Sequence, residues 1–314
     1  MVDIAKYAKD PWGLRAALLK ESTSAIAEAS AAYIRHGFPE LDLLTAARRF
    51  ANYVIIDAAP GDWQSLERVW FFPWAESSAE LDRSLSLATL GQYRAAYDHQ
   101  RRGLELIAIG IFFVSEHTTI EQARAWMQST DPTPRFAKAL ASLAQHTAAV
   151  RLAALVDWRD RIEKHYWKLC DIAHVRGLAA GSYSVQPTHI SFDGVDVPEF
   201  SEESLRASLD SYIITVRLAC LMLSLSNPSL LFDYGIEDKF GLNGPLSGFL
   251  EPYQVEVLRN VLPDDIRDPL LQIADTEPLV EGFREYFSSR PDITEEELEQ
   301  QILDFRAQFD SPDV

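Results

Sequence analysis

The sequence is poor in the residues that build disulfide frameworks and metal sites. It contains only two cysteines, Cys170 and Cys220, in 314 residues. Each lies in an apolar, helix-like segment, where cysteine usually serves as a small buried hydrophobic residue. No spacing of Cys and His typical of a zinc site is present. We therefore expect no disulfide, no metal ion and no cofactor.

Positive charge is also scarce. The chain has 29 Lys and Arg against 47 Asp and Glu, a formal net charge of −18. Such an excess opposes nonspecific binding to nucleic acid and to anionic membranes. The acidic excess is concentrated after about residue 250, whereas the central part of the chain is balanced or slightly basic. A local RNA site therefore stays open.

Patterns for targeting, membrane insertion and repeats are missing as well. Residues 1–6 lack the basic and then apolar pattern of a signal sequence, so we expect a cytoplasmic protein. Residues 212–223 are apolar but are interrupted by Arg217, which is unfavourable in lipid, so we expect a buried core helix and no membrane partner. No repeat of 20–50 residues and no low-complexity tract is evident.

Apolar side chains, by contrast, are abundant enough for a packed globule. Hydrophobic residues make up 47% of the chain, with 7 Trp, 16 Phe and 11 Tyr. Residues 93–114 and 152–178 repeat apolar positions three and four apart, which is typical of helices. We predict that these two central segments pack side by side and turn their few polar groups toward a shared spot. Helices expected at residues 81–90 and 201–225 complete a four-helix core.

The predicted fold class is all-α: a multi-helix bundle with one minor β-hairpin near residues 189–198 and a small acidic helical C-terminal lobe. The hairpin is predicted because polar and apolar residues alternate around Asp193-Gly194. Residues 240–245 contain two glycines and a proline and are a candidate linker. The predicted domains are a helical bundle over residues 1–240, with its core at about 81–226, and the lobe over residues 245–314.

Aromatic residues crowd residues 63–74, around Pro73. Because proline interrupts helices, we expect an irregular aromatic wedge here, followed by a helix with its cap at residues 77–80. One hypothesis for this wedge is a small-molecule pocket lined by Trp70, Trp74 and Glu105. Another is a platform on which nucleic-acid bases stack.

Glu105 is a carboxylate beside the apolar run that ends the first central segment. A buried charge must be paired or must change its pKa. Arg101 and Arg102 precede it by four and three residues, so a local ion pair is available on the neighbouring helical turn. A functional carboxylate is the alternative.

The second central segment carries two histidines, His165 and His174. At about 100° per residue, His174 shares a helix face with Trp167 and Cys170. A lone histidine beside core residues is more often hydrogen-bonded and structural than catalytic. A histidine pKa near neutrality nevertheless suits proton transfer, so both residues are candidates.

A resemblance to a known family covers the central third of the chain. Arg159, followed by Asp160 and then His165, resembles the Arg-x5-His signature of HEPN domains, small helical bundles that include ribonucleases of toxin–antitoxin and phage-defence systems. Residues 101–105 (Arg-Arg-Gly-Leu-Glu) and 166–174, with Tyr, Leu and His at similar spacing, resemble two helices of HEPN-like bacterial proteins. The resemblance implies a metal-independent ribonuclease of bacterial defence or stress, with its site across a homodimer interface.

In such a ribonuclease, the resemblance implies that Arg159 stabilises the scissile phosphate while His165 or His174 transfers protons. The binding residues expected beside them are Arg102, Glu105 and Arg176. The alternative, favoured by the overall acidity, is a non-catalytic helical binding or scaffold protein in which these Arg and His residues are structural. Its acidic C-terminal lobe would then offer a surface to a protein partner.

Overall fold

The computed structural model describes residues 10–59, 71–115, 118–174, 189–192, 195–243 and 248–309. Within these ranges the protein is a helical bundle with one pair of short strands. The predicted all-α class is therefore confirmed.

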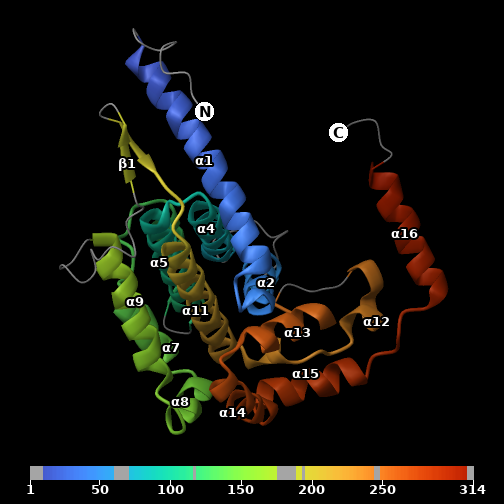
Figure 1. Cartoon of the computed structure of the whole chain (residues 1–314). Coiled ribbons are helices and arrows are strands. Elements are labelled where there is room, and N and C mark those ends of the chain that lie inside the picture. The colour runs from blue at the N-terminus through green and yellow to red at the C-terminus, as the bar shows by residue number, and fades with distance from the viewer. Residues whose placement is uncertain are drawn as a thin grey trace.

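Four helices form the centre of the bundle. They are α4 (Phe72–Thr89), α5 (Tyr93–Val114), α9 (Trp158–His174) and α11 (Glu202–Ser226). The central helix is α5, which contacts α4, α9 and α11. Figure 1 shows α11 in front of α5, with α4 and α9 on either side. The contact between α5 and α9 confirms that the two central segments lie side by side.

The packing of α5 follows from its apolar pattern. Leu104, Ile107 and Ile111 recur three and four residues apart and are fully buried. Gly103 lets α4 approach closely, because a Cβ at this position would lie 2.9 Å from the Leu81 side chain. At the same point the Ser77 hydroxyl donates to the Gly103 carbonyl at 2.8 Å. Small side chains thus set the distance between α4 and α5.

The start of α4 corrects the expected aromatic wedge. Phe72, Pro73 and Trp74 form the first turn of a continuous helix, and Ser77 and Ser78 are in its interior rather than at its cap. Proline is tolerated in a first turn because its missing N–H would have no helical partner there. Trp63 and Trp70, the other two tryptophans of the expected wedge, lie outside the described residues.

The second central segment is also not one helix. After α7 (Phe136–Leu143), the short helix α8 (Thr147–Ala153) ends, and residues 154–157 connect it to α9. The break has a local cause, since the Asp157 side chain accepts from the backbone N–H of Asp160 at 3.2 Å and caps a new helix. Trp158 ties the two helices together by donating from Nε1 to the Ala149 carbonyl at 3.0 Å.

The N-terminal helices cover one side of the bundle. They are α1 (Pro11–His36), α2 (Leu41–Arg49), a π-helical turn (Phe50–Val54) and α3 (Ile55–Asp57). Asp10 caps α1 by accepting from the Gly13 N–H at 2.9 Å, with Pro11 in the first turn. In Figure 1, α1 rises well beyond the bundle.

The two strands, β1 (His189–Phe192) and β2 (Val195–Pro198), pair antiparallel with His189 opposite Pro198 and Phe192 opposite Val195. They are a minor addition to the helical fold.

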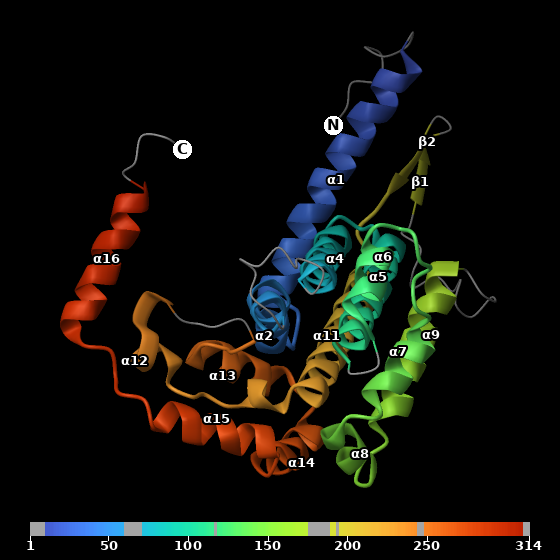
Figure 2. The same ribbon diagram turned by 180° about the vertical axis from the view of Figure 1, so that it is seen from behind.

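The remaining helices are α6 (Ile120–Met127), α12 (Ile236–Phe240), α13 (Pro252–Val261), α14 (Asp264–Asp275), α15 (Pro278–Ser288) and α16 (Glu295–Phe309). Buried residues of α13 and α14, such as Leu258 and Leu270, belong to the same core as α5 and α11. By contrast, α15 contributes Phe287 to a separate aromatic cluster with Tyr234. Figure 2 shows α16 standing apart from the bundle. The domain division at residues 240–245 stays a prediction.

By length and composition, α11 is the one helix in the described ranges that could cross a membrane. Of its most apolar stretch, 83% is buried inside the protein.

Candidate functional site

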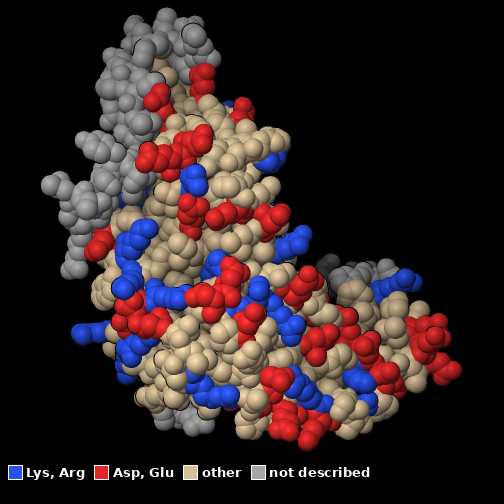
Figure 3. Space-filling model, turned by 60° about the horizontal axis from the view of Figure 1, so that its bottom comes forward, with Lys and Arg blue, Asp and Glu red and all other residues tan. Residues whose placement is uncertain are grey.

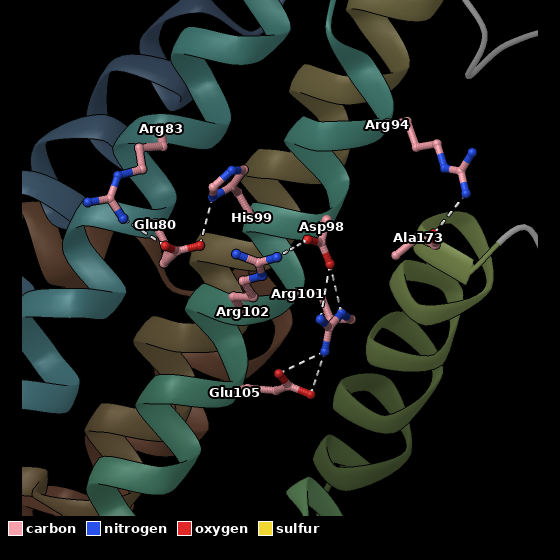
Figure 4. A network of polar contacts seen from close by, with 9 residues as sticks. All are labelled: Glu80, Arg83, Arg94, Asp98, His99, Arg101, Arg102, Glu105 and Ala173. Carbon is pink, nitrogen blue, oxygen red and sulfur yellow. Dashed lines mark hydrogen bonds and ion pairs between the residues drawn. The ribbon is translucent and has the colours of Figure 1, made fainter. Parts of the chain in front are cut away.

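A polar seam runs along α5, with Arg101 and Glu105 at its centre (Figure 4). Arg101 donates from Nη1 to both carboxylate oxygens of Glu105 at 2.8 Å, and from Nη2 to Asp98 at 3.0 Å. The predicted local ion pair is therefore confirmed for Arg101. Arg102 instead pairs with the second oxygen of Asp98 at 2.7 Å and is half exposed.

Glu105 is also held from α9. The Tyr166 hydroxyl donates to Glu105 at 2.5 Å, and its ring stacks on Phe136 with centroids 3.9 Å apart. Burial and, next, the hydrogen bond to Glu105 raise the pKa of Tyr166 above its ordinary value. Tyr166 therefore stays a hydroxyl donor, and Glu105 has partners on both helices.

A second cluster beside the seam was missed by the sequence analysis. His99 on α5 places Nδ1 2.7 Å from Glu80 Oε2 on α4, and Arg83 donates to Glu80 Oε1 at 2.7 Å. The Glu80 side chain is only 9% exposed. The sequence predicts a helix cap at this position, whereas Glu80 lies inside α4 and faces His99 on α5.

His165 lies inside the protein, on the side of α9 that faces α11. It is 7% exposed, and its Nε2 lies 2.8 Å from Thr215 Oγ1. Thr215 and Ser211 in turn lie at hydrogen-bond distance, 3.5 and 2.7 Å, from the buried Gln100 side-chain oxygen. Burial and, to a smaller extent, the Lys168 charge lower the pKa of His165 to about 4. At neutral pH this histidine is an uncharged part of the core.

Arg159 is separated from His165 around α9. The Arg159 side chain is 44% exposed and donates from Nε to Glu163 at 2.8 Å. Residues six apart on an α-helix point about 120° away from each other. The Arg-x5-His pair therefore does not converge on one spot.

His174 is exposed at the last residue of α9. Next to it, the Ala173 carbonyl accepts from Arg94 Nη2 on α5 at 3.0 Å, as Figure 4 shows. Arg176 lies outside the described residues. Of the six predicted site residues, the structure thus brings Arg102 and Glu105 into one seam and places Arg159, His165 and His174 in three different surroundings.

A groove beside His165 gathers cationic side chains. It encloses about 680 Å³ between α9, α11 and the start of α14. Its lining residues are Arg161, Lys164, His165, Lys168, Ile214, Arg217, Leu218, Pro263, Asp264 and Asp265. Ile214 is 43% exposed and forms an apolar patch among the charges.

Three of the four cations of this groove pair with carboxylates, and one of these pairs joins Lys164 Nζ to Asp160 at 2.6 Å. Arg161 forms a bidentate ion pair with Asp265, at 3.0 and 2.5 Å. Arg217 donates from Nη2 to Asp264 at 3.1 Å, but its buried Nε has no hydrogen-bond partner in the described part of the chain. Figure 3 shows blue Lys and Arg side chains interleaved with red acidic ones toward the side that carries α9. On the opposite side, which carries α16, red acidic side chains predominate.

Two kinds of chemistry lack a site in the described ranges. They hold no group of three His, Cys, Asp or Glu side chains arranged to bind a metal ion. Burial raises the pKa of both thiols, Cys170 and Cys220, which disfavours the reactive thiolate.

Comparison with known proteins adds no relative from which a function could be transferred. The chain matches no protein-family model, no curated protein and no solved structure.

Proposed function

We propose that this protein is a non-catalytic helical binding protein, in which the groove between α9 and α11 receives an acidic, amphipathic helix. The observation that carries the proposal is the set of cations around the apolar patch formed by Ile214. Lys164 and Lys168 line the groove beside Ile214. Exposed cations around an apolar patch suit a helix that presents both carboxylates and apolar side chains.

The electrostatic setting supports an anionic partner. The chain as a whole carries a net charge of −18, yet four Lys and Arg and only two Asp line this groove. Within the described part of the chain, Lys168 is exposed and makes no ion pair. The free Nε of Arg217 adds a buried donor without an acceptor, an arrangement that a carboxylate ligand would satisfy.

The surroundings of the Arg and His residues support binding over catalysis. A general acid or base should have a pKa near the working pH. Burial and Lys168 instead hold the pKa of His165 at about 4, and Arg159 is engaged with Glu163. Both are accounted for as structural residues.

The chain itself carries a helix of the required kind, so we propose a second copy as the partner. In α16 the first turn holds Glu295, Glu296 and Glu297. Leu303 and Phe305 are 57% and 53% exposed. None of its described side chains is buried. Docking on the groove of a second copy would cover the exposed face of α16 and pair its carboxylates with Lys164 and Lys168.

A titration tests the groove directly. A fluorescein-labelled peptide of residues 292–309 is added to the full-length protein, and its anisotropy is recorded. We expect saturable binding that Lys164→Glu/Lys168→Glu weakens by at least about tenfold, because attraction becomes repulsion. The matched control, Arg15→Glu/Lys20→Glu on the distant helix α1, makes the same change of charge and should bind like the wild type. No binding, or equal loss in both variants, would contradict the proposal.

A ribonuclease is the second candidate, favoured by one observation at the end of α9. The exposed His174 follows Ala173, whose carbonyl binds Arg94, so a histidine and an arginine come from two helices to one surface. Purified protein incubated with a mixture of RNAs tests this candidate. Cleavage that His174→Ala and Arg94→Ala abolish would support it, whereas intact RNA in all reactions would rule it out.

A further inference from the structure

A pocket distant from the α9–α11 groove lies where the bundle meets α15. It encloses about 330 Å³, at the lower end of the range for small-molecule sites. Its walls come from Trp74 on α4, Val114 at the end of α5, Leu223 on α11, and Leu279 and Phe283 on α15. The pocket is therefore built from segments far apart in the sequence.

One wall carries a buried donor without an acceptor. Trp74 is 1% exposed, and its indole Nε1 has no hydrogen-bond partner in the described ranges. Buried indole N–H groups usually find a partner. The other buried tryptophan of the described ranges, Trp158, follows that rule by donating to the Ala149 carbonyl at 3.0 Å. Trp74, the exception, lines the pocket.

The other lining groups define the chemistry of a ligand. Ala58, Leu230 and Phe249 add to the apolar walls, and no Lys, Arg, Asp or Glu is among the described residues that line the pocket. The Ser226 and Ser229 hydroxyls already donate within the protein, to the Leu223 carbonyl and to Asn227 Oδ1. His146 and Asn227 add polar groups to walls that are otherwise mainly apolar, and the Trp74 N–H is a buried donor without an acceptor in the described ranges.

We propose that this pocket binds a neutral, mainly apolar small molecule whose single carbonyl oxygen accepts a hydrogen bond from Trp74 Nε1. The Trp74 ring is fixed for this role by its fit against α5. A Cβ on Gly110 would lie 3.1 Å from Cε2 and Cζ2 of the indole, so the absence of a side chain there makes room for the ring. This proposal is independent of the groove and of its partner.

A matched pair of probes isolates the hydrogen bond. Binding of 2-acetylnaphthalene and of 2-ethylnaphthalene to the full-length protein is measured by equilibrium dialysis. The two compounds have similar shapes, but only the first carries an acceptor. We expect the acetyl compound to bind at least about tenfold more tightly, which corresponds to about 1.4 kcal/mol.

Variants assign that difference to Trp74. Trp74→Phe removes the N–H and should lower the affinity for the acetyl compound to that for the ethyl compound, while Trp126→Phe, outside the pocket, should change neither. Trp74→Phe should lower the melting temperature by a few degrees, because the smaller ring leaves a cavity although no protein hydrogen bond is lost. Should this variant fail to fold, Leu279→Trp, at a half-exposed wall position, should block both compounds.

Equal affinity of the two compounds for the wild type, no binding of either, or unchanged preference in Trp74→Phe would overturn the proposal.

Discussion

His165 lies in a buried polar cluster with residues from two other helices. Thr215 on α11 lies at hydrogen-bond distance from His165 Nε2, and Gln100 on α5 lies at hydrogen-bond distance from Thr215. A charged imidazole here would lose its hydration and would also face the nearby Lys168 ammonium. At this position, folding and protonation therefore oppose each other.

We predict that His165 makes the protein less stable in mild acid. Its pKa is about 4 when folded, below the ordinary value of about 6.5. Between these values the unfolded chain binds a proton that the folded protein does not, so stability falls as the pH falls through this window. From pH 7 to pH 5, the wild type should lose about 2 kcal/mol more unfolding free energy than His165→Gln.

Urea unfolding at the two pH values measures this difference. The control is His174→Gln, which changes an exposed histidine and should follow the wild type. Equal pH dependence of the wild type and His165→Gln would mean that His165 is protonated normally in the folded protein.

The polar seam leads to a second prediction. Tyr166→Phe keeps the ring against Phe136 but removes the donor to Glu105. We expect a loss of about 1–2 kcal/mol in unfolding free energy, because a partly buried carboxylate loses a hydrogen bond. Arg102→Gln, which removes a half-exposed ion pair, should lower it by less than about 0.5 kcal/mol. Chemical denaturation that ranks the two variants in the opposite order would contradict the assigned roles.

What the sequence reveals at this scale depends on distance along the chain. The Arg101–Glu105 pair is four residues apart, so helix geometry alone predicts it. The partner of His165 comes 50 positions later, and nothing in the local pattern around His165 indicates it. A usable signal is the spacing of Ser211 and Thr215, polar residues four apart and therefore on one side of α11, where both are buried.

The closest contact of α5 with another helix is the one with α4, and this contact occurs at Gly103. Gly103→Ala would place a methyl group 2.9 Å from Leu81. We predict a destabilisation of about 1–3 kcal/mol, since a packed core accommodates extra volume poorly. Gly282→Ala on α15 meets nothing within 4 Å and should stabilise the protein by up to about 1 kcal/mol, because alanine favours helix.

Thermal unfolding of the two glycine variants provides the measurement. Because the two variants should change the stability in opposite directions, their comparison tests the packing of α4 against α5 without an absolute value of the stability. A Gly103→Ala variant as stable as the wild type would show that α4 and α5 are further apart than described.

Element boundaries can be predicted where a cap is unambiguous and are harder to predict where a residue has two roles. Asp10 and Pro11 mark the start of α1 because both favour a first turn. Pro73 within an aromatic run predicts a break in the helix, yet proline also suits the first turn of α4. Asp157 divides α8 from α9 by a side-chain cap that apolar periodicity does not register.

For the whole molecule, composition and periodicity sufficed to predict an all-α bundle. They could not predict the groove, because its lining combines Arg161, Ile214 and Asp265 from three helices. The net charge of −18 even pointed away from a cationic site. Local concentration of charge is a property of the folded surface, as Figure 3 shows.

The proposed dimer needs opposite charges on two separate parts of the same chain, which permits a reciprocal exchange. One variant reverses the groove, Lys164→Glu/Lys168→Glu. The other reverses the helix, Glu295→Lys/Glu296→Lys/Glu297→Lys/Glu299→Lys. Each variant alone would set like charges against each other, whereas a mixture would restore attraction at both contacts.

Sedimentation equilibrium of the two variants, separately and as an equimolar mixture, is the most direct test of the central claim that the α9–α11 groove binds an acidic helix. We predict a dimeric wild type, two monomeric variants and a dimer in the mixture, weakened as salt screens the charges. A mixture that stays monomeric, or single variants that still dimerise, would contradict the account.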